Sequence, residues 1–185
     1  MKVGIVGASG AVGLEIIKLL QERKFNLSSL TLFGSKRSAG KSIKFRNKRI
    51  VIKQLKSSSL KEFDLIFFSA GSKISKQYAP IAAKNNCIVI DNSSAFRMKK
   101  NIPLIVPEIN GGDLQRNKSK IIANPNCTTI ISLMAIKPLY DLSPIKRIIA
   151  TSFQSVSGAG NLGMEELEKN TKNFLSKKEN GKNRV

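Results

Sequence analysis

One cysteine, Cys127, is the residue of this 185-residue chain with the clearest potential for chemistry. A short apolar stretch typical of a strand, residues 121–123, ends just before it. An apolar stretch with helical spacing, predicted to run from Thr128 to Tyr140, begins just after it. The thiol would then face the unpaired N–H groups and the positive dipole end of the first helical turn, which favour a thiolate. This placement predicts a nucleophilic cysteine.

The residue that usually assists such a cysteine is missing, since the chain contains no histidine. A cysteine nucleophile normally works beside an acid or base, most often histidine. The sequence therefore predicts either an unusual partner for Cys127 or a protein whose usual partner lies in a part absent from this chain. The other cysteine, Cys87, opens an apolar strand-like stretch and is predicted to be a small buried side chain without a chemical role.

A second chemical feature is a glycine loop of the form G-x-x-G-x-x-G. A β-branched stretch, residues 2–6, precedes this loop, and an amphipathic helical pattern, residues 14–24, follows it. In that context glycines let the backbone approach a pyrophosphate at a helix N-terminus, although a plain packing turn is the alternative. The loop predicts a dinucleotide site formed by Gly7, Ser9, Gly10, Ala11, Val12 and Gly13.

The second predicted strand covers residues 30–33, and the turn that follows it indicates whether the cofactor is NAD or NADP. A protein specific for NAD usually has an acidic residue there to bind the ribose hydroxyls. This chain instead has Ser35, Arg37 and Ser38, which are donors suited to a 2′-phosphate. The sequence therefore predicts NADP as the cofactor, with a solvated basic loop as the alternative.

Further polar candidates follow two later strands. The run from Asp91 to Arg97 comes at the carboxyl end of a predicted strand, where open α/β sheets bind their ligands. Arg97 could bind a phosphate or carboxylate through paired hydrogen bonds, or be an ordinary surface arginine. Gln154 ends another predicted strand. A glutamine can orient a substrate but cannot act as a base, and its residue type alone supports a structural role equally well.

The elements that would position these residues alternate between strands and helices, which is typical of a Rossmann-type, mostly parallel sheet in the α/β class. Strands are predicted at 2–6, 30–33, 64–69 and 87–90, a hairpin at 43–45 and 49–55, and helices at 14–24 and 75–85. Later segments are predicted as strands at 104–106, 121–123 and 146–155 and as a charged helix at 162–176.

The predicted strand at 146–155 has no later strand to pair with, so it would form an exposed sheet edge. We therefore expect the chain to lack part of a larger fold. The predicted organisation is an NADP-binding Rossmann domain over residues 1–126 and the start of a second α/β catalytic and dimerisation domain over residues 127–185.

Composition narrows the classes of partner. Lysine and arginine number 32 and acidic residues 12, which gives a net charge of +20, but the basic residues are scattered singly along the chain. This pattern favours a solvated basic surface and no nucleic-acid partner, with nucleic-acid binding as a weaker alternative. No apolar stretch approaches the roughly 18 residues of a membrane span, and no signal-peptide pattern is present. Two isolated cysteines favour neither a disulfide framework nor a metal site, so we predict a cytoplasmic protein without a metal.

Taken in order, the motifs resemble those of the aspartate-β-semialdehyde dehydrogenase family. They are VGIVGASGAVG, GSKRSAGK, DNSSAFR, VPEIN, NPNCTT and FQSVSGAG, and they extend from Val3 to Gly160. The resemblance implies a two-domain fold that forms a homodimer at full length. It also implies NADPH-dependent reduction of L-aspartyl 4-phosphate to L-aspartate 4-semialdehyde with release of phosphate, a step toward lysine, methionine and threonine. N-acetyl-γ-glutamyl-phosphate reductase and a non-catalytic NADP-binding protein are the alternatives.

The resemblance also implies roles for individual residues. Cys127 is similar to the nucleophile that forms a thioester, and Arg97, Asn126 and Gln154 are similar to substrate-binding residues. Ser9 to Val12 would line the pyrophosphate, Arg37 and Ser38 the 2′-phosphate, and Ser157 with Gly158 the nicotinamide. Members of the family are much longer than this chain, and their remaining part supplies the acid/base histidine. We therefore expect the isolated chain to be inactive in turnover.

Overall fold

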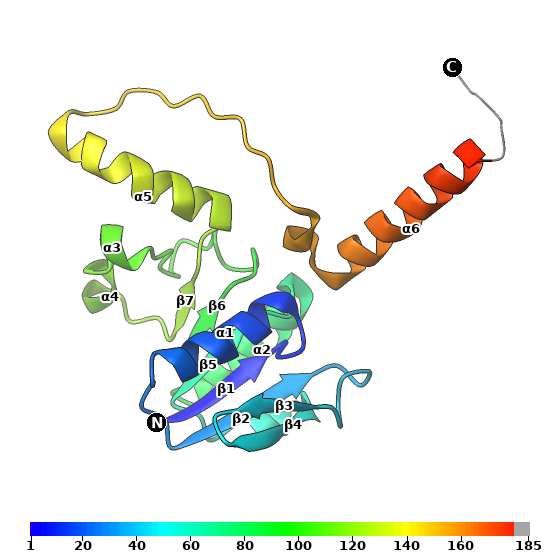
Figure 1. The fold of residues 1–185 in the computed structure, drawn as a ribbon. Helices are drawn as coiled ribbons and strands as arrows, with labels where there is room; N and C mark the ends of the chain where they lie inside the picture. The colour runs from blue at the N-terminus through cyan, green and yellow to red at the C-terminus, as the bar shows by residue number, and fades with distance from the viewer. Residues whose placement is uncertain (180–185) are drawn as a thin grey trace. The chain divides into compact units, whose positions relative to one another are not determined.

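The computed structural model describes residues 1–179 (Figure 1). The chain divides into two compact units, Met1–Ile149 and Ala150–Val185. The first unit contains the sheet and most of the helices. The described part of the second unit contains a 3-10 helix, η2 (Val156–Ala159), and a long helix, α6 (Gly160–Glu179), which confirms the charged helix predicted there.

A seven-stranded sheet forms the centre of the first unit, in the order β3-β4-β2-β1-β5-β6-β7. Every neighbouring pair is parallel except the β3–β4 hairpin, which turns at Arg46 and Asn47 as predicted. This confirms the Rossmann-type, mostly parallel sheet. The strands are β1 (Lys2–Val6), β2 (Ser29–Gly34), β3 (Ser42–Phe45), β4 (Lys48–Gln54), β5 (Leu65–Phe68), β6 (Ile88–Asp91) and β7 (Ile121–Ala123).

Helices cover both faces of this sheet, so its central strands β1 and β5 are apolar on both sides. Helix α1 (Ala11–Glu22) packs on one face, and α2 (Ser72–Lys84) with the 3-10 helix η1 (Ser57–Leu60) packs on the other. Successive strand residues alternate between the two faces, so Ile5 joins the α1 core while Val6 joins the α2 core. A strand buried on both faces has to read as a continuous apolar run, which is why β1 and β5 were recognisable in the sequence.

The parallel strands end at one edge of the sheet, called here the carboxyl edge. Strand β1 lies between β2 and β5, so the chain leaves β1 for one neighbour and later returns on its other side. Ligands bind at such a reversal of strand order in open α/β sheets. The residues that follow the strands at this edge are Gly7, Ser35, Ser69, Asn92 and Asn124.

Beyond β6 the chain forms two one-turn helices, α3 (Pro107–Asn110) and α4 (Asp113–Arg116), and then α5 (Cys127–Leu142). Helix α5 confirms the helix predicted at 128–140 and extends it by one residue at the start and two at the end. Helix α5 packs against α3. In the part of the chain that the structure describes, none of the α5 residues is classed as buried. No helix among residues 1–179 combines the length and apolar character needed to cross a membrane.

Two predicted strands are wrong. Of residues 104–106, only Leu104 makes an isolated parallel bridge, to Ala123. Residues 144–155 have no regular secondary structure, and Ile149 and Phe153 are 85% and 98% exposed. Their β-branched and aromatic residues suit an extended conformation, but a strand also needs a hydrogen-bonded neighbour, and no strand of the described chain pairs with this segment. The predicted domain boundary at residue 126 stays a prediction.

Candidate active site

The glycine loop lies at the carboxyl edge and is held across it by the backbone. The N–H groups of Gly7 and Ala8 donate to the carbonyl of Phe33 in β2, at 3.0 and 3.1 Å. Gly7 has a φ of +88°, and a Cβ added there would lie 2.6 Å from the backbone oxygen of Ser69, just after β5. A Cβ at Gly13 would overlap the carbonyl oxygen of Gly7. Both positions therefore require glycine, because the loop folds tightly against two strands and α1.

The start of α1 is suited to an anion. Its N-cap, Gly10, makes no side-chain cap, and the first turn contains no acidic residue. Ala11 and Val12 are exposed there, and Ser9 is half-buried. The first N–H groups of a helix have no intrahelical partner and carry the positive end of its dipole. The loop residues predicted from the sequence are therefore brought together in a geometry that fits the pyrophosphate of a dinucleotide.

The turn after β2 contains the three predicted 2′-phosphate donors. Ser38 is buried, its N–H donates to the carbonyl of Ser35 at 3.0 Å, and the two serine hydroxyls share a hydrogen bond of 3.0 Å. Arg37 is exposed on the same turn. The sequence has no acidic residue between Glu22 and Glu62, so nothing in this stretch neutralises the guanidinium. Ser38 shapes the turn from inside, while Ser35 and Arg37 present donors outward.

Arg97 is held between the ends of two strands. Its Nε donates to the carbonyl of Asn124 and its Nη2 to the carbonyl of Asn92, both at 2.9 Å. The Asn124 amide donates to Oδ1 of Asn92 at 2.7 Å, which joins the two segments directly. A guanidinium has five N–H donors, and these two bonds leave three without a partner among the described residues. Those three are available to an anion.

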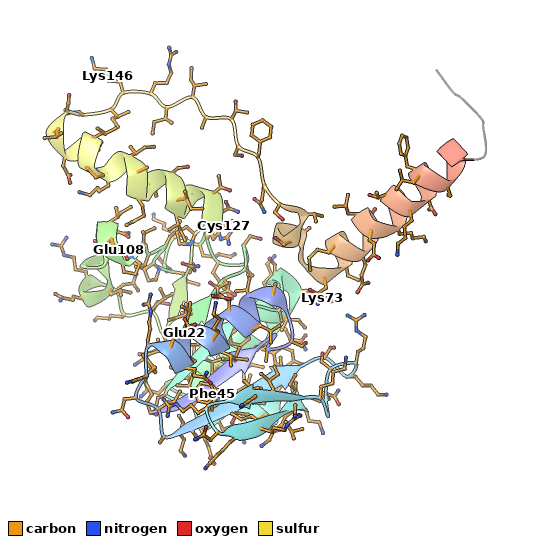
Figure 2. All side chains as sticks on the ribbon, in the orientation of Figure 1. Glu22, Phe45, Lys73, Glu108, Cys127 and Lys146 are labelled. Carbon is orange, nitrogen blue, oxygen red and sulfur yellow. The ribbon has the colours of Figure 1, made fainter. Side chains whose placement is uncertain are left out.

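Cys127 is exposed and is the first residue of α5 (Figure 2). The preceding residue, Asn126, caps the helix by accepting a hydrogen bond from the N–H of Thr128 at 2.9 Å. Asn124, whose carbonyl holds Arg97, lies three residues before the cysteine, so one short segment carries both the arginine contact and the thiol. Asn126 was predicted to bind substrate, and its amide oxygen is engaged in capping, which leaves its NH₂ for that purpose.

Cys87 contrasts with this exposed thiol. It is fully buried in the α2 core, which confirms its predicted structural character. Burial, together with the smaller effect of the negative charge of Asp64, raises the pKa of the Cys87 thiol to about 12. Cys87 therefore stays protonated under ordinary conditions.

The remaining predicted residues belong to the second unit. Ser155 and Ser157 share a hydroxyl–hydroxyl hydrogen bond of 3.0 Å, and the N–H of Gly158 donates to the carbonyl of Ser155 at 3.1 Å. A Cβ at Gly158 would overlap the side-chain amide nitrogen of Gln154, so that amide lies directly against the turn. The roles predicted for Gln154, Ser157 and Gly158 stay predictions.

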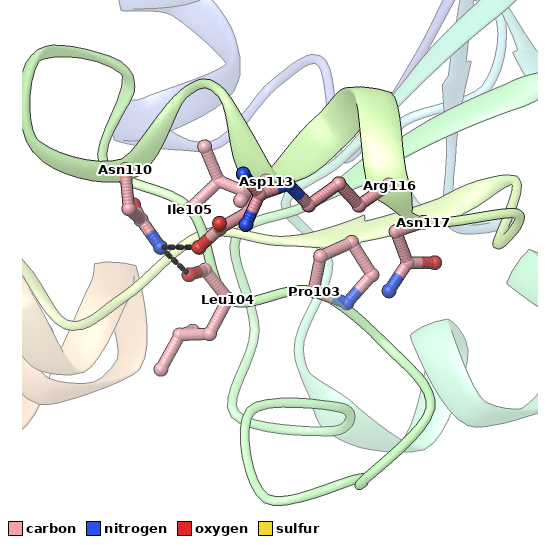
Figure 3. Close-up of a pocket in the computed structure, with 7 residues that line it drawn as sticks. All are labelled: Pro103, Leu104, Ile105, Asn110, Asp113, Arg116 and Asn117. Atoms are coloured by element: carbon pink, nitrogen blue, oxygen red, sulfur yellow. Dashed lines mark hydrogen bonds between the residues drawn. The ribbon is translucent and has the colours of Figure 1, made fainter.

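A separate pocket of about 280 Å³ lies beside α3 and α4 (Figure 3). Asn110 donates from its NH₂ to the carbonyl of Leu104 and to Oδ2 of Asp113, at 3.0 and 3.2 Å. None of the site residues predicted from the sequence lines this pocket; its lining residues are Pro103, Leu104, Ile105, Asn110, Asp113, Arg116 and Asn117. Among the described residues, no group of three histidine, cysteine or acidic side chains could hold a metal ion.

The sequence analysis missed the residues that support Arg97. Asn92 and Asn124 follow adjacent parallel strands, and this shared position at the carboxyl edge was the signal that could have identified them. Asp91 and Ser75 are fully buried and bonded to each other at 2.6 Å, although they are 16 residues apart. No spacing in the sequence signals that pair, because it depends on how α2 packs over β6.

Comparison with known proteins agrees with this arrangement. Residues 2–117 match the family model described as the NAD-binding domain of semialdehyde dehydrogenase, and residues 136–185 match the model of its dimerisation domain. The aspartate-semialdehyde dehydrogenases of Aquifex aeolicus and of a Synechocystis strain are 47% and 46% identical, over 96% of this chain and 53% and 52% of their own lengths. The chain thus spans about half the length of these relatives.

A solved structure is similar as well. The crystal structure of aspartate semialdehyde dehydrogenase II from Vibrio cholerae, described as complexed with ASA, has a TM-score of 0.88 and 44% identity. The match covers 95% of this chain and 52% of that one. The chain therefore belongs to the semialdehyde dehydrogenase family, as a homologue of about half of an aspartate-semialdehyde dehydrogenase.

Proposed function

We propose that this chain contributes the dinucleotide loop and the cysteine nucleophile to NADPH-dependent reduction of L-aspartyl 4-phosphate to L-aspartate 4-semialdehyde. The observation that carries the proposal is the segment Asn124–Cys127. It places an exposed thiol at the start of α5, three residues from the carbonyl that holds Arg97. A nucleophile and a cation with unused donors, both attached to one short segment, are suited to an acyl phosphate, which has an electrophilic carbon bonded to an anionic leaving group.

The first step follows from these two side chains. The Cys127 thiolate attacks the acyl carbon and forms an S–C bond, while the bond from that carbon to the phosphate oxygen breaks and phosphate leaves with the electron pair. Arg97 would bind the phosphate through its three remaining N–H donors and stabilise the charge that builds on the leaving group. The product is a thioester on Cys127. Gln154 and the Asn126 NH₂ would orient the substrate.

The dinucleotide, when bound, supplies the hydride that brings the acyl group to the aldehyde level and frees the thiolate. In the proposal Gly7 and Gly13 let the backbone approach the pyrophosphate, and the first turn of α1 binds it. Ser35 and Arg37 bind a 2′-phosphate, with Ser38 shaping their turn, so the cofactor is NADP. Ser157 and Gly158 would bind the nicotinamide. The protein acts in the cytoplasm, and members of the family at full length form homodimers.

The proposal separates acylation from turnover. Acylation needs only a thiolate and a bound leaving group, both available in this chain. Hydride transfer also passes through a tetrahedral oxyanion on Cys127 that a proton donor would stabilise, and the chain has no histidine to act as that donor. We therefore propose that this polypeptide is acylated by the substrate but does not turn over by itself.

The test is to mix the chain with L-aspartyl 4-phosphate and measure intact mass and peptide masses. We expect one acyl group on Cys127 that hydroxylamine removes, as it removes thioesters. The Cys127→Ser variant should gain no hydroxylamine-sensitive acyl group, and the Cys87→Ser variant should behave like the unmodified chain. Absence of an adduct on Cys127 would support a non-catalytic NADP-binding protein. Faster acylation by N-acetyl-γ-glutamyl phosphate would support the reductase that acts on that compound.

A further inference from the structure

We infer that Asp91 is a positioning residue that sets the orientation of Arg97 toward the anion. The inference rests on the proposed function, in which Arg97 binds the phosphate of the substrate. Asp91 is the last residue of β6 and is fully buried, and neither the glycine loop nor the nucleophile makes use of it.

Hydroxyl and backbone donors surround the Asp91 carboxylate. The hydroxyl of Ser75, in α2, donates to Oδ1 at 2.6 Å, and the N–H of Ser93 donates to the same oxygen at 3.3 Å. The hydroxyl of Ser93 donates to Oδ2 at 2.8 Å and accepts from the N–H of Ala95 at 3.1 Å. One carboxylate therefore fixes the turn that follows β6 and joins it to α2.

This turn determines where Arg97 can lie. Asn92, between Asp91 and Ser93, supplies the carbonyl that accepts from Nη2 of Arg97 at 2.9 Å. At the far side of the turn, the hydroxyls of Ser94 and Ser72 share a hydrogen bond of 2.9 Å, which is a second connection to α2. Asn92 is also bonded through its N–H to the carbonyl of Phe68 at 2.9 Å and through its side chain to Asn124. If the Asp91 bonds were lost, these would hold the Asn92 carbonyl less firmly, and one of the two acceptors that orient Arg97 would be displaced.

A buried carboxylate at this position needs an explanation, because burying one is unfavourable unless hydrogen bonds compensate it. Asp91 forms no ion pair with a lysine or arginine in the described part of the chain. Both of its oxygens instead accept from donors of the turn and of α2. An asparagine would place an NH₂ against one of these donors, so only a carboxylate accepts on both sides.

The experiment compares two alkylating reagents on the full chain. Iodoacetate is an anion and iodoacetamide is neutral, so the ratio of their rate constants at Cys127 measures how strongly the site attracts an anion. The ratio cancels changes in thiol exposure or thiolate fraction, since these affect both reagents. The variants are Arg97→Gln, Asp91→Asn, Ser75→Ala and the double variant Asp91→Asn with Arg97→Gln. Asp113→Asn is the control, because it removes one exposed carboxylate from α4.

We expect Arg97→Gln to lower the iodoacetate/iodoacetamide ratio about fivefold, the effect of one partly screened charge. Asp91→Asn should lower the ratio about threefold, and Ser75→Ala about twofold, by releasing the turn. The double variant should match Arg97→Gln alone. The sign is decisive, because loss of a negative charge acting only through space would raise the ratio. Asp113→Asn should not lower it.

Two results would overturn the inference. If Arg97→Gln lowers the ratio while Asp91→Asn and Ser75→Ala leave it unchanged or raise it, Asp91 does not position Arg97, although the proposed function stands. If Arg97→Gln has no effect, Arg97 is not the anion-binding group, and the roles of both residues fail together. Should Asp91→Asn not fold, as judged by circular dichroism, Ser75→Ala decides by the same criterion.

Discussion

The two edges of the parallel sheet each carry one of the two cysteines, and the two thiols differ in almost every physical respect. Cys87 lies at the amino edge, just before β6, and is fully buried among apolar side chains. Cys127 lies beyond the carboxyl edge, after β7, and is exposed at the start of a helix. The same residue type is a core side chain at one edge and a candidate nucleophile at the other.

The difference follows from how a βα unit directs its polar groups. At the carboxyl edge β1, β5 and β7 each pass through a short loop into a helix start, where the first N–H groups have no intrahelical partners. At the amino edge the chain enters the strands directly, and backbone groups such as the N–H of Asp64 and the carbonyl of Lys2 are already paired, at 3.0 Å. Binding and catalysis therefore concentrate at the carboxyl edge, and packing dominates the other.

The largest expected contrast is in alkylation. At pH 8 about one part in 10⁴ of Cys87 is ionised if its pKa is near 12, and only a thiolate reacts. Burial of the Cys87 side chain slows its alkylation further. We expect iodoacetamide to modify Cys127 at least about a thousandfold faster than Cys87, measured by peptide mass spectrometry on the native chain. Equal labelling of Cys87 and Cys127 in the folded protein would contradict this prediction. Labelling in urea is the control, in which the two cysteines should react at similar rates.

The next effect concerns the backbone of the carboxyl edge. Gly7→Ala should lower the free energy of unfolding by about 3 kcal/mol, because φ is positive there and the new Cβ meets the backbone of Ser69. Gly112→Ala is the matched control, since its φ is −60° and nothing lies within 4 Å of the added Cβ. Urea denaturation would measure both. A Gly7 variant as stable as the Gly112 variant would contradict the tight turn.

A smaller effect should appear at the amino edge as pH rises. The pKa of Cys87 is raised from 9.0 to about 12 in the fold. Between these values the unfolded chain releases a proton that the native state keeps. The contribution to stability is therefore complete below pH 9 and is lost as pH rises toward 12. From pH 8 to 10.5 the chain should lose about 2 kcal/mol more unfolding free energy than Cys87→Ala does. If the unfolding free energies of the unmodified chain and of Cys87→Ala fall in parallel with pH, the buried Cys87 thiol does not contribute this pH dependence.

The smallest expected effect is at the cap of α5. Asn126→Ala removes the side-chain acceptor for the N–H of Thr128 and should cost about 1 kcal/mol of unfolding free energy. Asn126→Ser should cost much less, because serine also caps. Urea denaturation of the two variants would measure the difference. If both lose the same amount, the Asn126 side chain stabilises the fold through something other than the cap.

Much of this arrangement was predictable because it depends on local pattern. Apolar runs indicated β1, β5 and β6, and the glycine spacing indicated the loop before α1. The hairpin at Arg46 and the helix after Cys127 were likewise predictable from neighbouring residues. The strand predicted at 146–155 failed for the complementary reason, since pairing with another strand is not encoded in the segment itself.

Local sequence thus determined the buried strands, the helices between them and the residue types with chemical potential, because turns, caps and alternation act over a few residues. Tertiary structure alone decided which of those residues meet. The bond between Ser75 and Asp91 and the contact of Arg97 with Asn124 join segments separated by 16 and 27 residues. Such contacts depend on the order of strands in the sheet and on the packing of α2 over it. Burial likewise assigned different chemistry to two identical thiols, because the environment of a side chain is a property of the whole fold.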